Sequence, residues 1–193
     1  MRRLGLLLVG SLALGAAPAW AQDDTDTANV AVNGNVAPLC ILGPPSPATV
    51  DLGQMVATSG SRIGRIATLP NQLVSLPGSF CNFAGSAIDV SVTALVADDN
   101  TTLQPGFARA VNYTASVENW AATAAVATSA ATTDGSDPTE NSIGATQPLP
   151  KIADLSVTLS GFTVPSDLLL IAGNYQGAVV VTLGPAASGE GDK

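Results

Sequence analysis

The chain has 193 residues, with seven basic against fifteen acidic side chains, a formal net charge of −8 and no histidine. That charge argues against nucleic acid and anionic lipid as partners, because both would be repelled. Without histidine, Ser-His-Asp and Cys-His catalysis and the usual zinc and iron sites are excluded. G-x-S-x-G, G-x-G-x-x-G and P-loop patterns are also missing, so we expect neither an enzyme nor a cofactor.

The N-terminus has the pattern of a secretory signal peptide. Arg2 and Arg3 precede a short apolar run over residues 4–17, and Ala19-Trp20-Ala21 is an A-x-A cleavage pattern. We therefore expect residues 1–21 to be removed and the chain to be exported. Loss of the two arginines would change the net charge from −8 to −10. We expect no membrane span, since no later segment reaches the ~18 apolar residues that one needs.

The first segment after that site alternates in polarity, with small or apolar residues at Val30, Val32, Gly34 and Val36. Two interpretations compete. Asn33-Gly34 is a strong type I′ hairpin signal, although arms of about three residues are marginal by themselves. Alternatively the strand continues through Gly34 and adds to the sheet edge of a neighbouring molecule, with valines in deep pockets and glycine where the groove is shallow.

The rest of the chain is expected to form strands and turns. Two pieces of one strand, residues 40–42 and 49–52, are interrupted by GPPSP, and a kinked strand follows over residues 73–83. Residues 121–133 favour a strand edge running into a long loop, although their alanines permit a helix. Four segments alternate with a period of two, as expected for antiparallel strands with one face on a core: residues 88–96, 111–117, 155–161 and 175–183.

Two cysteines, Cys40 and Cys81, are expected to form one disulfide in an oxidising compartment. A closed loop of about 42 residues predicts roughly 4 kcal/mol of stabilisation. The acidic clusters, among them TTDGSDPTEN, are interpreted as solvated loops. A calcium site is the alternative there, although the segment lacks the spacing of a known calcium loop.

These features follow one another in the order found in subunits of chaperone–usher fimbriae and in spore coat U-like secreted domains, which the chain resembles. The alternating strand with its mid-strand Gly34 precedes Cys40, and residues 49–54, TVDLGQ, are similar to the "TV-x-LG" segment of that family. Cys81 follows about forty residues later. Residues 172–183, AGNYQGAVVVTL, resemble the family's closing strand. Residues 97–150 carry no such resemblance.

The resemblance implies an immunoglobulin-like β-sandwich that lacks its last strand. A periplasmic chaperone would fill the resulting groove in transit, an outer-membrane usher would export the subunit, and the next subunit's N-terminal strand would fill the groove in a surface fibre. The implied donor positions are Ala28, Val30, Val32, Gly34 and Val36, and the implied acceptor groove includes Tyr175, Val179, Val181 and Leu183. Those four residues are equally interpretable as ordinary core.

Residues 184–193 extend beyond the closing strand, whereas subunits of the family end there. The expected organisation is therefore a signal peptide at 1–21, an N-terminal extension at 22–38, a sandwich at 39–183 and a disordered tail at 184–193. The expected function is a structural subunit of a bacterial fibre or coat. Two alternatives remain at this point: a sandwich completed by its own N-terminal strand, and a monomeric secreted binding module for a sugar or a protein.

Overall fold

The computed structural model describes residues 26–136 and 140–186, and the chain divides after Val36 into two units. The expected signal peptide lies outside the described residues. Residues 26–39 form no strand or helix. Across the described residues, no helix has the length and apolar character that crossing a membrane requires.

The described part of the second unit is built almost wholly from β-strands and turns. The period-two segments of the sequence form β3, β5, β8 and β10, each of which alternates between more buried and less buried side chains on most of its length. The elements are β1 (Cys40–Ile41), η1 (Gly60–Arg62), β2 (Gln72–Cys81), β3 (Ser86–Ala97), β4 (Phe107–Ala108), β5 (Ala110–Glu118), β6 (Ala125–Thr128), β7 (Glu140–Ile143), β8 (Lys151–Thr163), η2 (Pro165–Asp167), β9 (Leu169–Leu170) and β10 (Tyr175–Pro185).

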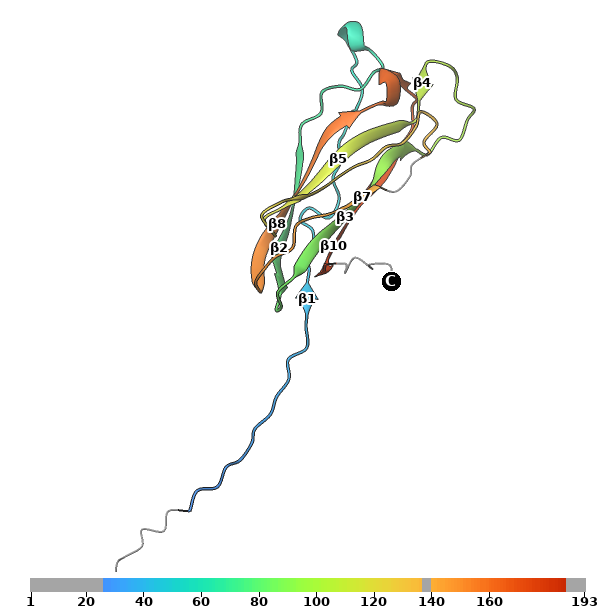
Figure 1. Ribbon diagram of the computed structural model, residues 1–193. Coiled ribbons are helices and arrows are strands. Elements are labelled where there is room, and N and C mark those ends of the chain that lie inside the picture. Colours follow the sequence, from blue (N-terminus) through green and yellow to red (C-terminus); the bar gives the residue numbers. More distant parts are fainter. Residues whose placement is uncertain (1–25, 137–139, 187–193) are drawn as a thin grey trace, which may run out of the picture. The chain divides into compact units, whose positions relative to one another are not determined.

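One antiparallel path connects most strands, in the order β1-β2-β8-β5-β3-β10 (Figure 1). Strand β5 joins its two halves, because Asn112–Glu118 pairs with β8 and Ala110–Val111 pairs with β3. A separate parallel pair, β4 and β9, lies outside this path. The sheet is nearly closed, and the strands at its two ends, β1 and β10, are not paired with each other in the described residues.

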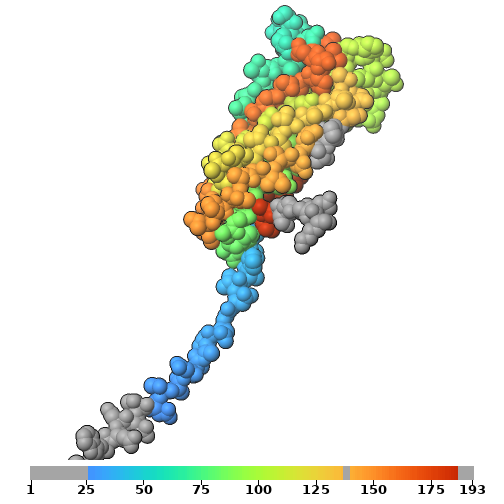
Figure 2. All heavy atoms as spheres, viewed as in Figure 1, coloured from blue at the N-terminus to red at the C-terminus, as the bar shows by residue number. Residues whose placement is uncertain are grey.

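The two halves of the sheet share one core. Its fully buried side chains come from both halves, among them Val90 and Val92 of β3 and Leu155 of β8. Strand β6 pairs with β5 and β7 pairs with β3, so these short strands connect the halves along one side. The chain between β5 and β8, yellow to orange, covers that side in the view of Figure 2. On the other side, between β10 and the chain that follows β1, no strand of the described residues connects the two halves.

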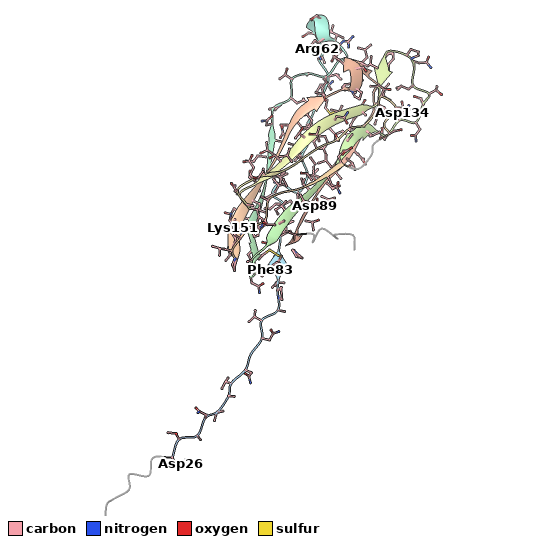
Figure 3. All side chains as sticks on the ribbon, viewed as in Figure 1. Asp26, Arg62, Phe83, Asp89, Asp134 and Lys151 are labelled. Carbon is pink, nitrogen blue, oxygen red and sulfur yellow. A yellow bond between two sulfur atoms is a disulfide. The ribbon has the colours of Figure 1, made fainter. Side chains whose placement is uncertain are left out.

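The disulfide between Cys40 and Cys81 is confirmed, and it joins β1 to the last residue of β2. Within this unit, β1 lies at one end, here called the base, and η1 and β4 lie at the opposite end, the tip (Figure 1). Figure 3 shows Phe83 at the base and Arg62 at the tip. The base is therefore where the chain enters the folded unit.

Several expectations from the sequence are confirmed. The kink expected at Pro77-Gly78 is a register shift of β2 between Leu76 and Ser79, with Gly78 at φ +67°. Residues 121–133 contain the short strand β6 and no helix. All-β architecture and antiparallel pairing follow the period-two pattern.

Two expectations are wrong in part. Residues 49–52 do not form a strand, because they have no neighbouring strand with which to pair. The tail was expected to begin at Gly184, yet Gly184 and Pro185 belong to β10, where they pair with Ala87 and Ser86. The later tail residues, 187–193, lie outside the described part of the chain.

Candidate functional site

A groove of about 850 Å³ opens on the unconnected side of the sheet. One wall is β10, the other is the segment from Leu42 to Met55, here called the rim segment. The floor consists of apolar side chains from β2, β3, β5 and β8: Val74, Leu76, Leu95, Tyr113, Val157 and Phe162. The groove is thus an apolar trough between two stretches of chain, with the core as its floor.

Three of the four residues expected to line an acceptor groove do so, namely Tyr175, Val179 and Val181. Leu183 lines a second hollow of about 560 Å³, which it shares with Cys40 and Phe83 near the base. All four side chains are half-buried, whereas core valines of β3 such as Val90 are fully buried. In the described structure, then, the inward face of β10 is only partly covered.

The outer edge of β10 carries backbone groups without a strand partner. Asn174, Ala178 and Ala186 direct backbone groups toward β3, where they bond Asp98, Thr93 and the adjoining Gly85. Since neighbouring residues of a strand point their N–H and C=O groups to opposite edges, the alternate residues point theirs into the groove. These are the same odd-numbered positions, Tyr175 to Leu183, whose side chains face the interior.

The rim segment also has unpaired backbone. Ser46 exchanges two hydrogen bonds with Ser75 of β2, and Ala67 N–H donates to Met55 O. Between these points, residues 48–52 make no backbone–backbone hydrogen bond within the described chain. Both walls of the groove therefore offer free donors and acceptors, which is the arrangement that an added β-strand satisfies.

Close packing holds the start of the rim segment against β2. Gly43 is buried, and a Cβ at that position would lie 1.9 Å from the carbonyl oxygen of Pro77. Its N–H donates to the hydroxyl of Ser79, which donates in turn to Leu76 O. Only glycine fits this approach, so Gly43 and Ser79 fix where the wall of the groove begins.

Both tyrosines of the chain border the groove and both use their hydroxyls. Tyr113 donates to Ala178 O at 3.2 Å, and Tyr175 donates to Ile171 O at 2.9 Å. Burial raises the pKa of Tyr175 to about 12, against a smaller lowering by the positive charge of Arg109. Both phenols therefore contribute apolar rings and satisfied hydroxyls to the groove, and the raised pKa of Tyr175 keeps its hydroxyl protonated at neutral pH.

The expected donor residues lie in the first unit, where the valine side chains are almost fully exposed. The exposed fractions are 82% for Val30, 91% for Val32 and 84% for Val36. Neither Asn33 nor Gly34 has positive φ, and no strand pairing occurs in residues 26–36, so the type I′ hairpin is wrong. The remaining interpretation is a strand without a partner in the described structure.

The chain is anchored just after this segment by Asn82. The side-chain oxygen of Asn82 accepts from Leu39 N–H at 2.7 Å, and its amide nitrogen donates to Ala37 O at 2.9 Å. The backbone N–H of Asn82 also donates to Leu39 O. Together with the Cys40–Cys81 disulfide, these bonds fix Ala37–Ile41 to the end of β2.

Neither a search of family models, nor one of curated proteins, nor one of solved structures gives a match to this chain. Within the described ranges, no group of three or more acidic or cysteine side chains is arranged to hold a metal ion. The Asp134 carboxylate, in the segment considered for calcium, bonds the Thr132 hydroxyl and Ser136 N–H instead. The argument for function therefore depends on the groove itself.

Sequence reasoning identified the β10 side of the groove and missed the rim segment as its second wall. Residues 49–52, with their apolar positions Val50 and Leu52, were interpreted as a strand that resumes after GPPSP, and their lack of a partner could not be seen without the fold. The floor residues are ordinary core positions by sequence, and only the open side of the sheet gives them a second role.

Proposed function

We propose that this protein is a structural subunit of a bacterial surface fibre, joined to like subunits by donation of its N-terminal strand. The observation that carries the proposal is the groove whose two walls have unpaired backbone and whose floor is apolar. A strand inserted there would bond β10 on one side and residues 48–52 on the other. Completed in this way, the domain would be an immunoglobulin-like sandwich.

The donor and the groove match in length and pattern. Along β10 the groove extends from Gly173 to Val181, which is about 27 Å of extended chain. Ala28 to Val36 spans the same number of residues, so it too is about 27 Å long when extended. Alternate valines of this segment would lie on the apolar floor, and the residues between them, such as Asn33 and Asn35, would face solvent.

Donation to a neighbour is favoured over insertion into the same domain. Ala37 and Leu39 are fixed at the base by Asn82, and from there the chain runs into β1 and away from the base. A strand ending at Val36 would have to reverse at once to enter its own groove. Insertion into another copy needs no such reversal.

The same proposal explains why a subunit would need a chaperone before it assembles into a fibre. An unfilled groove exposes an apolar trough and two strand edges, which invite aggregation. A periplasmic chaperone that lends a strand would protect it, and an outer-membrane usher would export it to the cell surface. The disulfide agrees with an oxidising compartment outside the cytoplasm.

The test compares the chain from Gln22 with one that begins at Ala37, by size-exclusion chromatography with light scattering and by SDS resistance. We expect polymers from the longer chain only. Val32→Asp should abolish the polymers, because it would bury a carboxylate against the apolar floor of the groove. The control, Asn33→Asp, adds the same charge on the solvent side of the strand and should still polymerise. Stable monomers from both chains would favour the binding module instead, and polymers that survive Val32→Asp would exclude this donor strand.

A further inference from the structure

An apolar row crosses the outer face of the sheet at the base. Ile41 of β1 lies opposite Phe80 of β2, and Phe80 lies opposite Ile152 of β8, so the three side chains share one face. Ile152 is 78% exposed and Ile41 is 47% exposed, and Leu39, 49% exposed, precedes them. We call Leu39, Ile41, Phe80 and Ile152 the base patch.

The base patch differs from the rest of that face. Farther from the base, the outward positions of β8 and β5 are polar, as in Ser156, Thr158 and Thr114. Elsewhere on that face the exposed apolar side chains lie singly beside polar ones, as Leu73 does opposite Thr158 and Val126 opposite Ser116, whereas at the base Ile41, Phe80 and Ile152 form one continuous row, which favours a contact surface there. Ile152 and Ile41 have no role in the core, since both point away from it.

The partner of the base patch can be inferred because the patch lies close to the donor strand along the chain. Leu39 is three residues after Val36, so the two lie within about 11 Å in any conformation. If residues 28–36 fill a neighbour's groove, the base of the donor must lie at one end of that groove. This inference therefore rests on the proposed function and adds a second contact to it.

The need for the fibre to keep growing determines which end of the acceptor's groove lies next to the base of the donor. If the donor strand ran parallel to β10, Val36 would lie at the acceptor's base, where the acceptor's own residues 37–39 leave toward the next copy. Successive bases would then crowd together. If the donor runs antiparallel to β10, Val36 lies at the acceptor's tip, each copy is displaced by a groove length, and a head-to-tail fibre grows.

The tip presents apolar side chains of its own. Ile63 is 60% exposed and Phe107 is 37% exposed. Backbone hydrogen bonds join Gly64, next to Ile63, to Ala57 and Leu170, and Phe107 pairs with Leu169, so backbone bonds connect the two segments that carry Ile63 and Phe107. We propose that the base patch of each copy packs on Ile63 and Phe107 of the copy that accepts its strand, and that this contact stiffens the fibre.

The experiment uses fibres of the exported full chain and measures their persistence length by electron microscopy. Ile152→Asn is expected to leave SDS resistance unchanged and to shorten the persistence length at least threefold. Ile143→Asn, a matched change at a side chain of β7 that is 55% exposed and outside the patch, should have no effect. Both side chains are exposed, so neither change disturbs the core.

A second variant tests the partner surface. Ile63→Asn should soften the fibre as much as Ile152→Asn, and the double variant should be no softer than either, because both remove one contact. If fibres of Ile152→Asn are as stiff as those of the parent, the proposed contact of the base patch is wrong, while strand donation is still intact. Additive softening would overturn the pairing with the tip, and absence of fibres from the parent chain would overturn the proposed function and this contact with it.

Discussion

At the scale of single residues, the groove is defined by side chains that satisfy their own polar atoms and leave apolar surface uncovered. Tyr175 is the clearest case, with its ring on the groove, its hydroxyl bonded to Ile171 O and its pKa raised to about 12 by burial. Tyr113 does the same from the floor, where its ring also stacks on Phe162 at 5.7 Å between centroids. Such residues shape an apolar surface whose own polar atoms are satisfied.

The raised pKa of Tyr175 predicts a pH dependence of stability. The folded domain keeps this phenol protonated, whereas the unfolded chain loses the proton near pH 10. Its contribution to the free energy of unfolding is therefore fully present below pH 10 and is lost as the pH rises from 10 towards 12. Melting temperatures of the parent and of Tyr175→Phe, measured by circular dichroism from pH 8 to 12, should favour the parent at pH 8, and this advantage should shrink and then reverse as the pH rises from 10 towards 12, because only the parent has the titrating phenol.

The variant lacks the hydroxyl and its hydrogen bond, so at pH 8 it should be less stable by about 1 kcal/mol. Two melting curves that stay parallel through pH 12 would show that Tyr175 is not buried as described, and that the wall of the groove is arranged differently.

At the scale of elements, β10 has one paired and one unpaired edge, and hydrogen exchange can distinguish them. The amides of Ala178 and the other even-numbered residues point toward β3, and those of Val179 and Val181 point into the groove. In the chain that begins at Ala37, we expect the odd-numbered amides to exchange at least a hundredfold faster than the even-numbered ones. Adding a peptide of residues 26–36 should slow the odd-numbered amides alone.

A peptide with Val32→Asp is the control and should leave the odd-numbered amides fast. Uniform protection of β10 without peptide would mean that the edge is already paired, and would contradict an open groove. Protection of all amides by the peptide would indicate general stabilisation of the domain and no pairing at this edge.

The elements that the sequence predicted correctly are those whose own pattern determines them. The alternation in residues 88–96 and 175–183 requires one face on a core, and the strands β3 and β10 result. The disulfide followed from there being two cysteines and an oxidising compartment. Residues 49–52 have the same local pattern as a strand, but strand formation needs a partner, and whether one is present is a property of the whole fold.

The candidate site was likewise predicted only in part from the sequence. Tyr175, Val179 and Val181 were expected at a groove from the resemblance of residues 172–183 to the closing strand of fimbrial subunits, and the period-two pattern placed them on one face of that strand. The depth of the groove, the wall around Gly43 and the base patch depend on register between distant strands, such as Ile41 with Phe80 and Phe80 with Ile152. No spacing in the sequence specifies that register, because a shift of one residue would turn each of these side chains to the other face.

At the scale of the whole molecule, assembly brings together copies of like charge. The net charge is −8, and the apolar surfaces proposed to meet, the donor valines, the groove and the base patch, contain few charged groups. Long-range repulsion between copies should therefore slow their encounter, while the energy of the assembled state comes from apolar burial and backbone hydrogen bonds.

This predicts that salt accelerates assembly. Raising NaCl from about 0.02 to 0.5 M shortens the Debye length from roughly 20 Å to about 4 Å and screens the repulsion between copies. We expect the rate of polymer formation, followed by light scattering, to rise several-fold over this range. The SDS resistance of the finished polymer should stay the same, because the buried contacts are not ionic.

Sucrose at matched osmolality is the control, since it carries no charge and should not reproduce the increase. The opposite result, a rate that falls as salt is added, would mean that attraction between opposite charges steers the encounter. The acidic Asp26 beside the donor strand and the arginines Arg62 and Arg65 at the tip would then be the groups to exchange. The direction of the salt effect thus separates fibre growth driven by apolar insertion from growth guided by charge.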